Sequence, residues 1–108
     1  MAGRPSVVFF GSGPVAAACL AKLADWCDIE AVVTKPQPAH HKQVFPVIEV
    51  AERLGLRTVY ATDRRELDAA LAAESFTSRL AILIDYGIIV SQSVIDSFPL
   101  GIVNSHFS

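Results

Sequence analysis

Cysteine is scarce in this 108-residue sequence, and there is no excess of positive charge. Cys19 and Cys27 are too few for a disulfide framework, and the gap between them does not match zinc-ligand spacing. We expect Cys19 on a buried helix face, and a reduced, cytosolic compartment fits both thiols. The formal net charge is −2, so the sequence lacks the overall basic field that drives nucleic-acid binding. Any nucleic-acid contact would need a local patch.

Long unbroken apolar runs are also missing. The apolar residues that follow Arg4 are divided by Gly11, Gly13 and Pro14, and Lys22 interrupts the second half. We therefore expect neither a targeting segment nor a membrane span. Repeats, linkers and low-complexity segments are absent as well. Since 52% of the residues are hydrophobic, the chain can bury the core of one small domain, or of part of one.

Strand and helix patterns alternate along the whole sequence. Short apolar runs predict strands at residues 6–10, 29–34, 57–60, 80–84 and 101–104. Helical spacing predicts one helix that starts at Pro14 and extends to Trp26, and a short one over residues 91–97. A further helix begins near Pro46, and an Asp63–Glu66 capping box begins another. The helix near Pro46 has one apolar face and Gly55 as its stop; the face comprises Val47, Val50, Ala51 and Leu54.

This alternation, with continuous rather than alternating apolar strands, predicts an α/β fold: a Rossmann-like doubly wound parallel sheet of about five strands. Ligands bind beyond the carboxyl ends of the strands in such sheets. Four segments fall there, namely residues 11–14, 34–43, 85–90 and everything after 104.

The first of these segments matches a loose dinucleotide fingerprint, G-x-G-x-x-A, from Gly11 to Ala16. The fingerprint also requires an acidic residue at the end of the second strand, and this strand ends in Thr34-Lys35 instead. A plainer interpretation is that the glycines form a tight turn and expose helix N–H groups to a ligand.

Three other motifs leave two interpretations open. His40-His41-Lys42 is either a solvated loop or a patch for an anionic partner, and we expect no metal site there. Asp85 either caps the next turn or polarises a neighbouring site. Ile88, Ile89 and Val90 either line a pocket for a flat ligand or pack beneath a loop.

Asn104 and His106 lie two residues apart at the end of the last strand, so both side chains can face one spot. An amide can stabilise a developing oxyanion while an imidazole moves a proton. The same pair could equally be structural.

In five segments the chain resembles the N-terminal part of methionyl-tRNA formyltransferase: FFGSGPVAAACLAKL, IEAVVTKP, FPVIEVAERLGL, DYGIIVSQSVID and PLGIVNSHFS. The resemblance implies a cytoplasmic enzyme of translation initiation that transfers a formyl group from 10-formyltetrahydrofolate to methionyl-initiator-tRNA. It implies that Asn104 and His106 are catalytic. It also implies that Gly87, Ile88, Ile89, Val90 and Ser108 contact the folate co-substrate.

The same resemblance implies that residues 1–108 are the N-terminal part of a catalytic domain whose C-terminal part is absent. The family's third catalytic residue, an aspartate, lies further downstream, so we expect the fragment alone to be inactive. The Asn-x-His-x-Ser element is shared with sugar-nucleotide and glycinamide-ribonucleotide formyltransferases, which remain alternatives. A folate- or nucleotide-binding module without catalysis, or a regulatory domain that pairs through a sheet edge, also stays open.

Overall fold

A computed structural model describes residues 3–40 and 43–105 of the chain. Strands and helices alternate through these residues as the sequence predicts, with most ends within one residue of the predicted ones. The elements are β1 (Ser6–Phe10), α1 (Pro14–Leu23), β2 (Asp28–Thr34), α2 (Pro46–Arg53), β3 (Thr58–Tyr60), α3 (Arg64–Ala72), β4 (Leu80–Ile84), α4 (Gln92–Asp96) and β5 (Ile102–Ser105).

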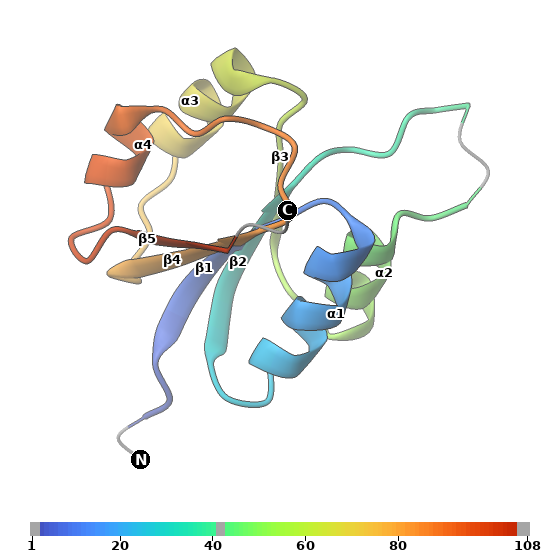
Figure 1. The fold of residues 1–108 in the computed structure, drawn as a ribbon, viewed down its shortest axis with the longest axis horizontal. Coiled ribbons are helices and arrows are strands. Elements are labelled where there is room, and N and C mark those ends of the chain that lie inside the picture. The colour runs from blue at the N-terminus through green and yellow to red at the C-terminus, as the bar shows by residue number, and fades with distance from the viewer. Residues whose placement is uncertain (1–2, 41–42, 106–108) are drawn as a thin grey trace.

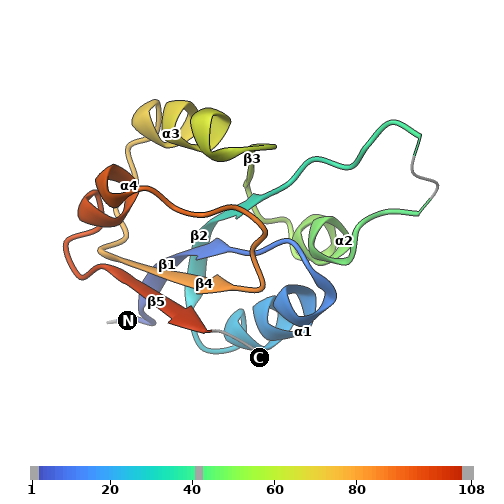
Figure 2. The ribbon, with the colours of Figure 1, turned by 45° about the horizontal axis from the view of Figure 1, so that its top comes forward.

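The strands form one sheet in the order β3-β2-β1-β4-β5, and every neighbouring pair is parallel. Helices α1 and α2 cover one face, whereas α3 and α4 cover the other (Figures 1 and 2). The predicted doubly wound architecture is therefore confirmed. Because the chain reverses its direction of winding between β1 and β4, the crevice above their carboxyl ends is the expected ligand position.

A separate apolar core fills each face of the sheet. Phe9 and Leu20 belong to the core beneath α1 and α2, whereas Phe10 and Leu67 belong to the core beneath α3 and α4. Phe9 and Phe10 are adjacent in β1 and point to opposite faces, as strand geometry requires. Continuous apolar strands are thus explained by burial on both sides.

Helix α1 is shorter than its periodicity predicts. It ends at Leu23, and Trp26 is 76% exposed rather than on the buried face. The reason lies outside the helix: the Arg4 guanidinium donates hydrogen bonds to the carbonyl oxygens of Ala24 and Cys27. These bonds hold the chain in a turn directly after the helix. Cys19 is half-buried against the core rather than fully buried.

The predicted start of α3 and the predicted end of α2 are present with two differences. Asp63 accepts a hydrogen bond from the Glu66 N–H at 2.8 Å, but the Glu66 carboxylate accepts from the Thr62 N–H and hydroxyl. The capping box therefore reaches one residue further back than predicted, to Thr62 rather than Asp63. Gly55 follows α2 with φ of 67°, as its predicted role requires, whereas Leu54 is exposed at the helix end.

Glu30 fixes the end of the sheet at which the strands begin, opposite the end where a ligand is expected. Its carboxylate accepts hydrogen bonds from the Thr77 and Ser78 N–H groups and from the Ser78 hydroxyl. Ser78 also bonds the hydroxyl of Ser6 at 2.7 Å. The amino ends of β1, β2 and β4 are thereby held in register. Among the described residues, no helix has the length and apolar character needed to cross a bilayer.

Candidate active site at the carboxyl end of the sheet

Asn104 stands on β5, paired in register with Leu83 of β4. Its side chain is exposed, and none of the residues that the structure describes hydrogen-bonds to its amide. Two adjacent hollows share it as part of their walls. The predicted position of Asn104 above the sheet is thus observed, while His106 and Ser108 lie outside the described residues.

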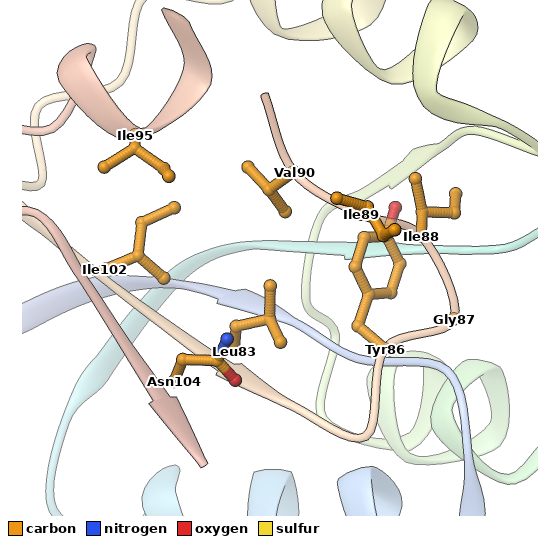
Figure 3. A pocket seen from close by; sticks show the side chains of 9 residues that line it. All are labelled: Leu83, Tyr86, Gly87, Ile88, Ile89, Val90, Ile95, Ile102 and Asn104. Atoms are coloured by element: carbon orange, nitrogen blue, oxygen red, sulfur yellow. The ribbon is translucent and has the colours of Figure 1, made fainter. Parts of the chain in front are cut away.

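The larger hollow is an apolar pocket of about 370 Å³. The loop that follows β4 forms one side of it, and the side chains of β5 and α4 form the other (Figure 3). Of the two interpretations of the apolar run after Gly87, the structure therefore favours the pocket. The lining comprises Leu83, Tyr86, Gly87, Ile88, Ile89, Val90, Ile95, Ile102 and Asn104.

The second hollow, of about 300 Å³, is polar. It lies between Asn104 and the glycine turn, and it shares Leu83, Tyr86 and Gly87 with the apolar pocket. Its other lining residues are Ser12, Asp85 and Ser105. An apolar molecule in one hollow and a polar one in the other would meet at Asn104.

Asp85 fixes the glycine turn against the end of β4. Its carbonyl oxygen accepts hydrogen bonds from the Ser12 and Gly13 N–H groups at 3.0 and 3.1 Å. Its carboxylate accepts from the Val15 N–H at 3.2 Å. Asp85 adopts a left-handed backbone with φ of 52°, a conformation that aspartate tolerates better than most residues. Asp85 therefore acts as a cap, as predicted, but its carboxylate caps the N-terminus of α1 rather than the next turn.

Gly13 is required by this arrangement. A Cβ atom built on it would lie 2.0 Å from Oδ2 of Asp85, far inside van der Waals contact. The N-terminus of α1, where a dinucleotide fold binds pyrophosphate, is thus occupied by a carboxylate of the same chain. The expectation that the turn offers its helix N–H groups to a ligand is wrong for Val15.

Lys35 brings a positive charge to the same edge. A Cβ atom on Gly87 would lie 2.7 Å from the Lys35 ammonium and 3.9 Å from Oγ of Ser12. The Gly87 N–H itself donates to Ser12 Oγ at 3.3 Å. Among the described residues, no carboxylate forms a salt bridge with Lys35. The loops after β1, β2 and β4 therefore converge at Gly87.

The far end of the pocket loop is anchored to α3. Ser91, which follows Val90, donates a hydrogen bond from its hydroxyl to Asp68 at 2.7 Å. The same oxygen accepts from the Val94 N–H at 3.4 Å and so caps α4. Ser91 is buried, so this anchor sets where the loop from Gly87 ends.

Sequence reasoning missed several lining residues. Leu83 and Ile102 were assigned only to strands, although Ile102 lies two residues before Asn104 and must share its face. Tyr86 forms part of both hollows, and nothing in its sequence neighbourhood predicts that. His40 is exposed, and the rest of its motif lies outside the described residues. Within the described part of the chain, no three His, Cys, Asp or Glu side chains cluster as metal ligands.

The fold and the placement of both hollows define a doubly wound α/β protein with its candidate site at the carboxyl ends of β4 and β5. Methionyl-tRNA formyltransferases are similar to the chain. The one from Akkermansia muciniphila is 32% identical in an alignment of 106 residues that covers 94% of this chain and 34% of the relative. For the Elusimicrobium minutum enzyme the identity is 35% in an alignment of 105 residues, which again covers 94% of this chain and covers 31% of the relative.

The methionyl-tRNA formyltransferase of Nitratidesulfovibrio vulgaris is 33% identical over 108 residues, covering 94% of this chain and 33% of the relative. No family model matches the chain. The chain spans about a third of the length of the curated relatives it matches. The similarity is thus to formyltransferases, and the matched residues are those of the N-terminal third of these enzymes.

Proposed function

We propose that residues 1–108 are the N-terminal part of a formyltransferase catalytic domain that acts in the cytoplasm. The reaction is transfer of the formyl group of 10-formyltetrahydrofolate to the amino group of methionyl-initiator-tRNA. One observation carries the proposal: Asn104 joins an apolar pocket to a polar hollow in a chain similar to methionyl-tRNA formyltransferases.

The apolar pocket suits the formyl donor. A folate has a flat heterocycle, and aliphatic walls with a few polar groups at the edge are typical of sites for such rings. The loop from Gly87 to Val90 supplies isoleucine side chains to the lining, and Asn104 supplies a polar group at its edge. The polar hollow, with Ser12 and Ser105 in its wall, then receives the amine. Lys35 is near enough to Gly87 to attract an anionic part of the acceptor.

The chemistry follows from this arrangement. The acceptor nitrogen attacks the formyl carbon, a new C–N bond forms, and the formyl oxygen becomes an oxyanion. The Asn104 amide donates a hydrogen bond to that oxygen, which lowers the energy of the tetrahedral intermediate. The bond from the formyl carbon to N10 then breaks as a proton passes from the acceptor nitrogen to N10. We assign this proton transfer to His106.

A dinucleotide site is the weaker alternative for the same edge. Pyrophosphate binds dinucleotide folds at the N-terminus of the first helix. In this chain the Asp85 carboxylate accepts the Val15 N–H there, and a second anion would be repelled by it. This supports a folate over a nicotinamide or flavin cofactor.

A chimaera tests the proposed activity. Residues 1–108 replace the matching N-terminal third of the Akkermansia muciniphila enzyme, and formylation of methionyl-tRNA is followed with 10-formyltetrahydrofolate. The chimaera is expected to be active, whereas Asn104→Ala lowers its kcat by about 10²- to 10³-fold, the usual effect of removing one oxyanion donor. The 108-residue polypeptide alone is expected to be inactive. A folded chimaera that keeps full activity with Asn104→Ala would overturn the assignment.

A further inference from the structure

The hydroxyl of Tyr86 is buried and has no hydrogen-bond partner among the residues that the structure describes. The ring is well packed: it meets Phe10 edge to face, with centroids 5.8 Å apart and an interplanar angle of 70°. Tyr86 is also a lining residue of both hollows. In Figure 3 its oxygen points toward the part of the loop that carries Ile88 and Ile89.

An unpaired buried hydroxyl is unusual, because the large majority of buried side-chain polar atoms are hydrogen-bonded. Phenylalanine would keep the contact with Phe10 and avoid the cost of desolvating an unpaired oxygen. Packing and stability alone therefore do not account for a tyrosine here. Burial also raises the pKa of Tyr86 well above its ordinary value, so the phenol stays protonated and can donate as well as accept.

We propose that the Tyr86 hydroxyl is a specificity-determining group that hydrogen-bonds the polar edge of a flat heterocycle bound in the apolar pocket. The proposal rests on the proposed function, which places such a ring there. Asn104 and the Tyr86 oxygen are the two side-chain polar groups among the pocket's lining residues. With one group toward the reacting carbon and the other toward the ring edge, the ligand has one orientation.

The loop above the hydroxyl can admit the ligand. Ile89 is 78% exposed, so its displacement by an incoming ring disrupts little packing. Ile88, in contrast, is buried and belongs to the core beneath α3 and α4. A ring that displaced Ile89 and left Ile88 in place would approach the phenol oxygen, which lies toward this part of the loop in Figure 3.

The test uses Tyr86→Phe in the 108-residue chain, with Tyr60→Phe as the matched control. Tyr60 lies on β3 and is 44% exposed, so loss of its hydroxyl is expected to change neither stability nor binding. Thermal unfolding is measured without ligand, and isothermal titration is performed with 5-formyltetrahydrofolate as a stable reduced folate.

We expect effects of opposite sign for Tyr86→Phe. The melting temperature of the free protein rises by roughly 4 to 8 °C, while the affinity for the folate falls by about three- to tenfold. A lowered melting temperature would mean that the hydroxyl already has a partner in the free chain, which overturns the proposal. Unchanged affinity in a variant whose wild type binds folate overturns it too. No binding by the wild type counts against the proposed function itself.

Discussion

The contact between Gly13 and Asp85 gives a sharp quantitative prediction. Gly13 has extended backbone angles, φ −94° and ψ −179°, which alanine adopts without strain. A Gly13→Ala substitution therefore perturbs one thing, the space beside the Asp85 carboxylate. The new Cβ would lie 2.0 Å from Oδ2, 2.6 Å from Cγ and 2.8 Å from Oδ1, so the carboxylate must leave the N-terminus of α1.

The cost can be worked out from what that carboxylate does. Losing its bond to the Val15 N–H removes a helix cap, which is worth about 1 kcal/mol. Moving its charge from the helix N-terminus removes a further 0.3 to 1 kcal/mol or so. Replacing glycine lowers the entropy of the unfolded chain and returns roughly 0.4 to 1 kcal/mol. These contributions leave a net loss of unfolding free energy of about 0.3 to 1.6 kcal/mol, and any strain left in the turn raises it toward about 2 kcal/mol.

A double-mutant cycle with Asp85→Gly isolates this interaction. Without the carboxylate, Gly13→Ala is expected to be neutral or slightly stabilising, giving a coupling energy of about 1 to 3 kcal/mol. Urea unfolding followed by circular dichroism measures it; fluorescence is less suitable because Trp26 is so exposed. Gly55→Ala is the control, since Gly55 has φ of 67° and no neighbour within 4 Å of a built Cβ. Its cost should be the same in both backgrounds. Additivity of Gly13→Ala and Asp85→Gly would refute the reasoning.

Three further predictions concern the loop anchor, the opposite edge of the sheet and the end of α1. Ser91→Ala removes both the bond to Asp68 and the cap of α4, so it is expected to cost about 1 to 2 kcal/mol in urea unfolding and to weaken folate binding. Ser91→Thr keeps the hydroxyl and restores both; a Ser91→Ala variant with full stability would contradict the anchor. Burial alone would raise the pKa of Glu30, but the hydrogen bonds from Ser78 and Thr77 together lower it below the ordinary value of 4.5. The stability that the ionised Glu30 carboxylate contributes to the fold is therefore present above pH 4.5 and is lost as the pH falls through the lower folded-state pKa of Glu30. Urea midpoints measured from neutral to acid pH should therefore fall less for Glu30→Gln than for the wild type in that acid range, and equal slopes would argue against the Glu30 network. Trp26→Gln is expected to change the unfolding free energy by less than about 0.5 kcal/mol, because the side chain is exposed. A loss of several kcal/mol would show that Trp26 is buried and would contradict its exposed position.

Local sequence patterns predict most of the fold, because apolar runs and helical spacing within each segment are enough to identify its strand or helix. The apolar run Leu80–Ile84 reads as a buried central strand, and β4 lies between β1 and β5 in the sheet. The helix ends are less well predicted where a distant residue sets them. Trp26 fits the helical spacing of α1, but Arg4 binds the carbonyl groups beyond Leu23, and periodicity cannot report a contact made from before β1.

The position of the candidate site in the fold could be predicted from the sequence, but the hydrogen bonds and side-chain packing within it could not. Asn104 and the loop from Gly87 follow from strand ends and parallel topology alone. The bond from the Val15 N–H to Asp85 joins residues 70 positions apart, and it decides that the glycine turn is already capped. The unpaired Tyr86 hydroxyl depends on how Phe10 and the loop pack around the ring. Such facts come from tertiary packing, which no short motif encodes.

The central claim is that the pocket beside Asn104 binds a reduced folate. Isothermal titration of the 108-residue chain with 5-formyltetrahydrofolate, and in parallel with NAD, tests it most directly. Two charge insertions make the test specific to the pocket. Ile89→Glu places a carboxylate on an exposed side chain of the lining, whereas Val103→Glu places one on β5, one residue before Asn104, at a position that is 56% exposed and does not line the pocket.

We predict binding of the folate by the wild type and by Val103→Glu, a loss of at least about tenfold with Ile89→Glu, and no heat with NAD. Binding of NAD without binding of the folate, or folate binding that Ile89→Glu leaves unchanged, would contradict the account.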